Sequence, residues 1–172
     1  MTEITTPVGR VVWGNLKGRP KVNQETKQPV LKDGKPVIQY SFGLAIPKDQ
    51  FAPVWAVMVA EGSKIFPSIA AGQIPPSFAM KFVDGDGIDS EGKPFNTREG
   101  YRGCYVLAIS TEAFEPPLTQ LVGPGQYQNV PGDTLKTGHF VRVALDIQSH
   151  GQKPGVPTSK AGLYLNPRLV EW

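Results

Sequence analysis

The stretch YRGCYVLAIS, residues 101–110, decides the fold that we expect for this chain. It combines aromatic and β-branched residues, follows a loop rich in Gly and Asp, and precedes Pro116-Pro117, which is typical of a β-strand. The stretch KTGHFVRVAL, residues 136–145, repeats the design, with a Gly near its start, then an aromatic residue and a valine. We therefore predict that these two strands form the middle of the protein.

The alternation of residues in the second stretch predicts two unlike faces. Val141, Val143 and Leu145 would share an apolar face with Ile147. Phe140 and Arg142 would instead point together to the opposite, more polar face. Aromatic rings among arginines are what proteins use to hold unpaired bases, so this face is a candidate for nucleic-acid contact.

The first stretch leaves two interpretations open for its second tyrosine. Tyr105 shares a face with Leu107 and Ile109, which favours packing in a core, whereas Arg102 projects from the opposite face. A tyrosine beside an arginine is also consistent with base stacking. Core packing and nucleic-acid contact therefore both stay open for Tyr105.

The remaining chain predicts short strands, one main helix and long loops. The helix is expected from Gln50 to Glu61, with Asp49 as its N-cap, Gly62 at its end and an apolar stripe of Phe51, Trp55, Met58 and Val59. A short helical turn is expected at residues 68–71. Strands are expected at residues 9–16, 38–46, 78–83 and 161–165 besides the two central ones. Long loops are expected at residues 17–36, 84–99, 116–136 and 148–160.

Size and composition favour one mainly β domain over residues 1–172. The 19 Gly and 17 Pro among 172 residues fit short strands joined by loops better than a helical bundle. Five or six strands with one main helix are most economically arranged as a closed or nearly closed antiparallel barrel.

The charge distribution is uneven along the chain. Residues 10–48 contain eight Lys or Arg against two acids, whereas residues 84–99 contain five acids against two basic residues, within a net charge of +3. One side could therefore attract a polyanion. The alternative is a solvated surface whose lysines keep edge strands apart.

The chemistry-bearing residues do not form a catalytic or metal-binding pattern. Residues 87–93 fit the start of a phosphate-binding loop, but Pro94 stands where Ser or Thr would hold magnesium. The two histidines are eleven residues apart and no Cys-x-x-Cys occurs, which disfavours a zinc site. A single cysteine, Cys104, allows no internal disulfide and suits a reducing cytoplasm. We expect no enzyme, no cofactor and no metal.

Four blocks in a fixed order carry a family resemblance. They are YSFGLAIPK at residues 40–48, FVDGD at 82–86, YRGCYVLAIS at 101–110, and GHFVR at 138–142 followed by AGLYLN at 161–166. With these blocks the chain resembles the single-stranded DNA-binding proteins of tailed bacteriophages, which have an OB fold. The resemblance implies an OB-fold-like barrel that coats and protects unpaired DNA during phage replication, recombination or repair, without strong sequence specificity.

The expected partners follow from this interpretation. They are single-stranded DNA and, further, phage or host replication proteins in the host cell cytoplasm, with a monomer or homodimer as the unit. The candidate nucleic-acid-binding residues are Arg10, Trp13, Lys17, Arg19, Lys21, Lys35, Lys48, Arg102, Tyr105, Phe140 and Arg142. A phage structural or assembly protein with a β-barrel is the alternative function.

Overall fold

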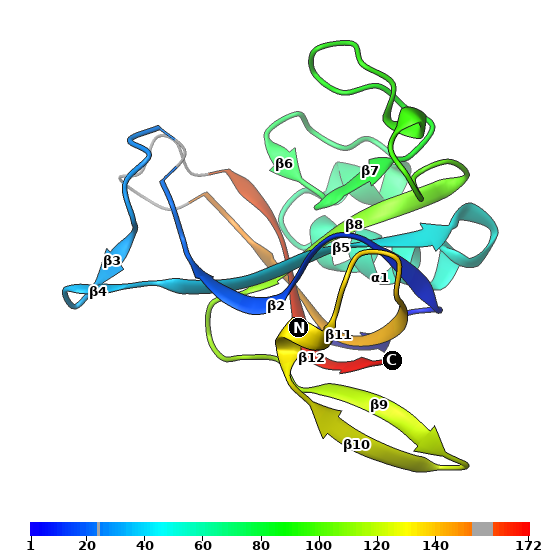
Figure 1. Cartoon of the computed structure of the whole chain (residues 1–172). Helices are drawn as coiled ribbons and strands as arrows, with labels where there is room; N and C mark the ends of the chain where they lie inside the picture. Colours follow the sequence, from blue (N-terminus) through cyan, green and yellow to red (C-terminus); the bar gives the residue numbers. More distant parts are fainter. Residues whose placement is uncertain (24, 153–159) are drawn as a thin grey trace.

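The structure is a computed structural model that describes residues 1–23, 25–152 and 160–172 (Figure 1). Within these residues it is mainly β with one α-helix, α1 (Ala52–Ser63), which confirms the predicted class. The strands are β1 (Thr2–Thr5), β2 (Gly9–Pro20), β3 (Leu31–Lys32), β4 (Lys35–Pro36), β5 (Ile38–Pro47), β6 (Phe78–Ala79), β7 (Phe82–Asp84), β8 (Cys104–Thr111), β9 (Leu118–Gly123), β10 (Gln126–Val130), β11 (Phe140–His150) and β12 (Ala161–Glu171). Short 3₁₀ turns are η1 (Lys48–Gln50), η2 (Pro67–Ala71), η3 (Phe95–Thr97) and η4 (Gly132–Thr134).

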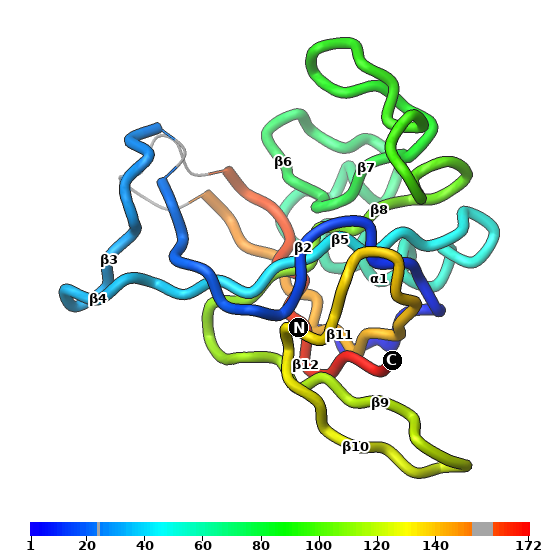
Figure 2. Tube along the Cα trace, in the orientation of Figure 1, coloured from blue at the N-terminus to red at the C-terminus, as the bar shows by residue number. Residues whose placement is uncertain are grey.

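One sheet joins most strands, in the order β10-β9-β12-β11-β2-β5-β8-β7. Strand β11 connects its two halves, because it pairs with β12 along most of its length and with β1 and β2 on its other side. The pairings are antiparallel except for those of β12 with β6 and β9. The path of the chain is followed most easily in the tube view, where β3–β4 and β9–β10 extend away from the centre (Figure 2).

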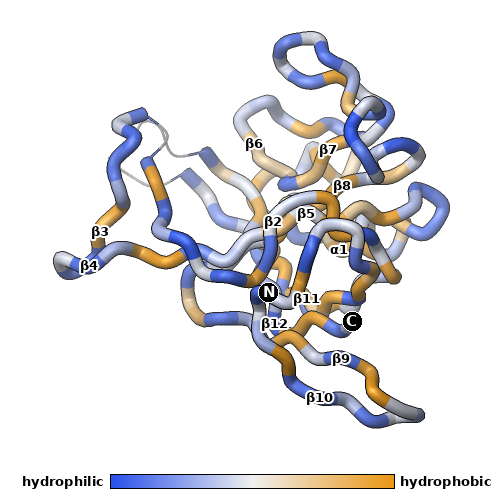
Figure 3. Tube along the Cα trace, viewed as in Figure 1, coloured by the Kyte–Doolittle hydropathy of each residue, from blue (hydrophilic) through white to orange (hydrophobic). Residues whose placement is uncertain are grey.

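The core lies between the central strands and α1. Phe42, Leu44 and Ile46 of β5 are completely buried, and Val143 and Leu145 of β11 join them, as the alternation predicted. Each such side chain contributes roughly 1.5–3 kcal/mol through removal of apolar surface from water. Hydrophobic colouring gathers on these central strands in Figure 3. Within the described residues, no helix has both the length and the hydrophobicity needed to cross a membrane.

Several predicted strand boundaries are wrong. The central strand begins at Cys104 and not at Tyr101, since Gly103 adopts a positive φ of 72° that ends the preceding turn. The expected strand 78–83 is two short strands, because Lys81 has a φ of 63° between them. Strand β12 continues to Glu171, past Pro167, which is tolerated beside a register shift.

The predicted loops are also partly wrong. Residues 116–136 contain the β9–β10 hairpin and η4, and the Gly-Pro-Gly that suggested a loop forms the hairpin turn. Residues 17–36, expected as a loop, include the end of β2 and the β3–β4 hairpin. Residues 148–150 belong to β11, whereas residues 153–159 of the predicted loop 148–160 lie outside the described residues. Residues 84–99 contain η3 and are otherwise largely irregular, as expected.

Helix α1 begins and ends later than predicted. Asp49 lies in η1 and does not cap the helix, whose N-cap position is Phe51 without a side-chain cap. The helix continues through Gly62, which is buried where an added Cβ would lie 3.2 Å from Ile69 Cδ1. Close packing against Ile69 therefore explains this glycine better than helix termination. The apolar stripe does face the core, with Phe51 and Met58 buried.

Glu61 is a buried carboxylate at the end of α1. Its Oε1 accepts hydrogen bonds from Thr2 Oγ1 at 2.6 Å and Lys64 Nζ at 2.5 Å, and only 1% of its surface is exposed. Burial alone would raise the pKa of Glu61, but the bonds from Lys64 and Thr2 and the nearby positive charges lower this pKa to about 2. The ionised carboxylate therefore ties β1 to the helix.

A depressed pKa in the folded state predicts how stability depends on pH. The contribution of Glu61 should be complete above its unfolded pKa of about 4.3 and should disappear as the pH falls towards 2. Glu61→Gln is expected to lower Tm at pH 7 by roughly 2–12 °C, for about 1–3 kcal/mol in a chain of this size. Thermal unfolding at pH 7 and pH 3 checks this, since the difference between the two proteins should shrink at pH 3. An equal difference at both pH values would contradict it.

Candidate nucleic-acid interface

Strand register places one row of side chains on the outer face of the sheet. Phe140 of β11 pairs with Arg10 of β2, Arg10 pairs with Ala45 of β5, and Ala45 pairs with Val106 of β8. Directly paired residues project to the same side of a sheet. Their neighbour Val11 is fully buried in the core, so this row faces outward. Phe140 is accordingly exposed over 61% of its surface, as the alternation of β11 predicted.

Trp13 lies on the same outer face, one row further along β2. It pairs with Gly43 of β5, which pairs with Ala108 of β8. A Cβ added to Gly43 would lie 2.1 Å from Trp13 Nε1, so the indole rests against the bare backbone of this glycine. Trp13 nevertheless keeps 37% of its surface exposed. The small residues of β5 and β8 therefore provide a floor on which an aromatic platform is held open to solvent.

The segment before β8 forms a wall beside this platform. Tyr101 is buried against Ala45 and Val106, and its ring stacks on Phe95 with centroids 6.1 Å apart. The guanidinium of Arg98 lies 4.7 Å from the centroid of Phe95, within the range of a cation–π contact. The positive φ of Gly103 turns this segment into β8, which lets Tyr101 fold back over the sheet.

Platform and wall enclose an open groove of about 300 Å³. Trp13, Phe95 and Tyr101 contribute its aromatic surface. Lys81 and Arg98 are its cations, and Arg98 Nη2 lies 3.1 Å from Asp89 Oδ2, so Lys81 contributes most of the positive charge. Lys81 is exposed and makes no ion pair with the residues that the structure describes. Flat rings beside cations can stack planar bases and neutralise phosphates without reading base edges.

Four of the predicted basic residues are held by carboxylates, namely Lys48, whose two partners are described below, and three others. Arg10 pairs with Glu99, Lys21 Nζ lies 2.6 Å from Glu112 Oε1, and Arg142 Nη2 lies 3.0 Å from Glu171 Oε2. A polyanion would have to displace these acids, which reduces what each cation can contribute.

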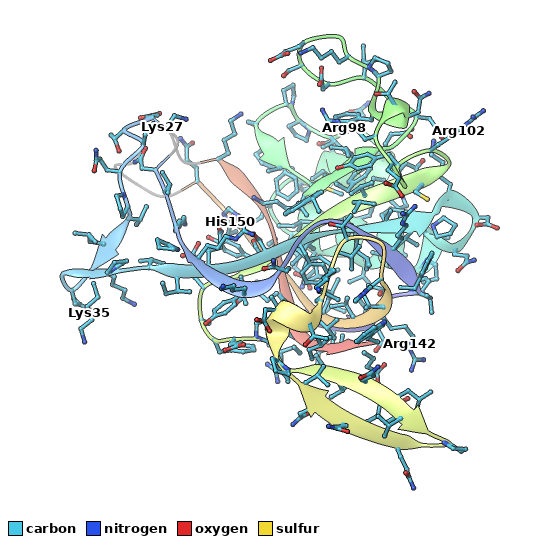
Figure 4. All side chains as sticks on the ribbon, viewed as in Figure 1. Lys27, Lys35, Arg98, Arg102, Arg142 and His150 are labelled. Atoms are coloured by element: carbon cyan, nitrogen blue, oxygen red, sulfur yellow. The ribbon has the colours of Figure 1, made fainter. Side chains whose placement is uncertain are left out.

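The other predicted cations of the region 10–48 lie along the outer end of β2 and on β4. Lys17, Arg19 and Lys35 are exposed, and the described part of the chain offers them no ion-pair partner. Lys35 lies at the end of the β3–β4 hairpin, on the opposite side of the molecule from Arg142 (Figure 4). The predicted residues therefore do not all gather at one place.

Lys48 and Tyr105 lie at a different place from the outer row. Lys48 Nζ lies 2.6 Å from Asp84 Oδ1 and 2.8 Å from Asp86 Oδ2. Hydrogen bonding to Asp84 and then Asp86 raises the pKa of Lys48 and lowers the pKa of both carboxyls. Tyr105 packs against Phe51 at 4.8 Å, on the core side of β8.

Arg102 is exposed in the turn before β8. It projects near the carboxylate of Asp86, whose pKa it helps to lower. The contact roles proposed for Lys48, Tyr105 and Arg102 stay predictions, and the structure brings none of the three into the row with Arg10 and Phe140.

The sequence-based prediction missed Lys81, Phe95 and Arg98. Phe95 and Arg98 follow the acidic loop in the stretch FNTREGY, residues 95–101, where an arginine stands between two aromatic residues. That spacing is a usable signal, because it is the same mixture that singled out Phe140 and Arg142. Nothing in the sequence around Lys81 indicated that it would line the groove, because its position depends on the break between β6 and β7.

The described residues contain no group of three His, Cys, Asp or Glu placed to hold a metal ion. Burial raises the pKa of the half-buried Cys104 thiol, which keeps it protonated and unreactive near neutral pH.

Comparison with known proteins shows which class has this fold. It is the fold of single-stranded DNA-binding proteins from bacteriophages. The protein of bacteriophage Enc34, in a structure with ssDNA, matches with a TM-score of 0.65 and 16% identity, over 98% of this chain and 84% of that one. Gp2.5, the single-stranded DNA-binding protein encoded by bacteriophage T7, matches with a TM-score of 0.56 and 12% identity, over 99% and 91%. At these identities the likeness shows the fold, which agrees with the resemblance found in the sequence.

A C-terminal truncation of the Enc34 protein gives a similar match, with a TM-score of 0.63 and 17% identity over 98% of this chain and 83% of that one. No protein-family model and no curated protein sequence matches the chain. The relationship is therefore visible in the arrangement of strands and not in the sequence as a whole.

Proposed function

We propose that this protein binds single-stranded DNA without strong sequence specificity and coats unpaired strands during phage DNA replication, recombination or repair. The observation that carries the proposal is the outer face on which Phe140, Arg10 and Trp13 lie in neighbouring rows. The fold, shared with a phage protein whose structure contains ssDNA, supports it. The protein acts by sequestration and not by catalysis.

The groove suggests how an unpaired strand is held. Bases stack on the exposed rings of Trp13 and Phe140, each at about 1–3 kcal/mol, while phosphates follow Lys81, Arg98 and the exposed cations Lys17 and Arg19 of β2. A base that is stacked within a duplex cannot stack on Trp13, so duplex DNA is bound only through the attraction between its phosphates and the cations. A strand held in this way is extended, which melts hairpins and excludes nucleases.

The finer architecture belongs to the same proposal. Strands β2, β5, β8, β11 and β12 would be the five strands of an OB-type barrel, with residues 1–172 acting as one binding domain. Such a domain would act in the host cytoplasm, as a monomer or homodimer, and could meet phage or host replication proteins there. Native mass spectrometry with and without oligo-dT would give the stoichiometry.

A titration of labelled oligo-dT at two salt concentrations tests the function. The affinity should fall with salt, with a slope near −0.7 for each phosphate contacted. Fluorescence anisotropy measures it, and a duplex of the same length serves as the control, which should bind more weakly. Absence of binding at low salt, or an affinity that does not depend on salt, would refute the proposed function.

A further inference from the structure

A second groove adjoins the first one. It has a volume of about 490 Å³, and Lys81 and Ala108 line both grooves. Its walls are β8 at Ser110 and Thr111 and β12 at Tyr164 and its neighbours. A strand that passes over Trp13 and Lys81 would therefore enter this second groove without leaving the protein surface.

The second groove lies where parts of two strand edges have no strand partner among the described residues. Strand β8 pairs with β7 only at residues 105–107, and β12 pairs with β6 only at residues 161–162 and with β9 at 170–171. Strands β8 and β12 lie next to each other between these points, but no ladder joins them among the described residues. Apart from the Ala108 N–H, which donates to the carbonyl of Lys81 at 2.8 Å, the backbone groups that face this gap have no ladder partner among the described residues and can bond a ligand that lies between the strands.

The side chains of the second groove repeat the mixture found in the first. Tyr164 is 40% exposed, and His150 stacks on it with centroids 4.1 Å apart and an interplanar angle of 25°. Lys81 adds positive charge, whereas the charge of the second lysine, Lys21, is offset by its ion pair with Glu112, which a phosphate would have to displace. In Figure 4, His150 lies towards the middle of the molecule, among the strands and away from Arg142. A stacked pair of rings beside two lysines favours a nucleotide over an extended peptide.

We propose that this groove, lined by Tyr164, Lys81 and Lys21 and with His150 stacked on Tyr164, is a second base-stacking subsite that lengthens the DNA-binding path beyond Trp13. The inference rests on the proposed function and concerns how many nucleotides one molecule holds. The first nucleotides of a bound strand occupy the groove at Trp13. Further nucleotides cross Lys81, and a later base stacks on Tyr164.

An oligo-dT length series tests the second subsite with Tyr164→Ala. Lengths from about 4 to about 16 nucleotides cover the range that single OB folds occupy. The ratio of wild-type to variant affinity should stay near one for the shortest oligonucleotides and rise to about tenfold once the strand reaches Tyr164. Longer strands offer more positions at which a protein can bind, and comparing the two proteins at the same length cancels this effect. Tyr164→Phe, which keeps the ring, should restore the wild-type ratio.

Each outcome decides the inference. Equal loss at every length would mean that Tyr164 acts through the fold, and would overturn the subsite. No loss at any length would also overturn it and would leave the two open strand edges to an extended peptide. Failure of the wild type to bind any oligonucleotide would refute the proposed function itself. If the wild type binds oligo-dT but the ratio of wild-type to variant affinity does not rise for long strands, the subsite is refuted and the proposed function stands.

Discussion

Trp13→Ala should weaken the binding of oligo-dT by about tenfold to a hundredfold, while the protein stays folded. The loss corresponds to one stacked base at about 1–3 kcal/mol. Because the indole rests on Gly43 outside the core, its removal uncovers backbone and leaves no internal cavity. The salt slope should stay the same, since no charge is removed.

Anisotropy titrations of wild type and variant with labelled oligo-dT measure this effect. Tyr127→Ala is the matched control, because Tyr127 is an aromatic residue exposed over 50% of its surface, on the β9–β10 hairpin and outside both grooves. The control should bind like the wild type. An unchanged affinity of Trp13→Ala, or an equal loss in both variants, would show that the outer face is not the interface.

Local patterns in the sequence predicted the parts of the fold that depend on alternation. Strand β5 and the buried face of β11 followed from large residues at every second position, which is how a strand with one core face is built. The exposed position of Phe140 followed from the same pattern. Such features depend on neighbours in the sequence, so a single chain is enough to predict them.

The parts that were wrong depend on pairing between distant segments. Residues 116–136 read as a loop because Gly and Pro dominate them, but β9 pairs with β12 through Leu118 and Val170 and so becomes a strand. Strand β12 likewise extends to Glu171 because β11 continues alongside it. Pairing of this kind overrides local propensity, which is weak in strands.

The candidate interface also combines features that local sequence patterns predicted with features that depend on pairing between distant segments. Trp13, Arg10 and Phe140 were chosen for residue type, but only register shows that they share one face. The basic region 10–48 was treated as one patch, yet Lys35 lies on the opposite side of the molecule from Arg142, and Lys48, which follows β5, is paired with two aspartates. A charge count along the chain could not reveal this pairing, because the two aspartates come from the end of β7 and the loop that follows it.

Gly85→Ala should both destabilise the protein and weaken its binding of oligo-dT. A Cβ at this position would lie 1.9 Å from the carbonyl oxygen of Tyr101 and 2.7 Å from that of Cys104. Both are backbone atoms, so no rotamer change relieves the contact. The turn before β8 must move away, although the Gly85 N–H now donates to Cys104 at 2.8 Å. Overpacking of about 1–3 kcal/mol would lower Tm by roughly 2–12 °C.

The effect of Gly85→Ala on binding follows from the residues that this turn positions. Tyr101 holds Phe95 and Arg98 against the groove, so a displaced turn removes one wall and should cost about tenfold in affinity, as for one stacking contact. Gly87→Ala is the control in the same loop, since its Cβ would come no closer than 3.1 Å to another atom. Calorimetry and anisotropy on the same samples separate the two effects. If Tm falls but the folded protein keeps its affinity, the wall formed by Phe95 and Arg98 is not part of the interface; if neither changes, the backbone contact at Gly85 does not constrain the turn.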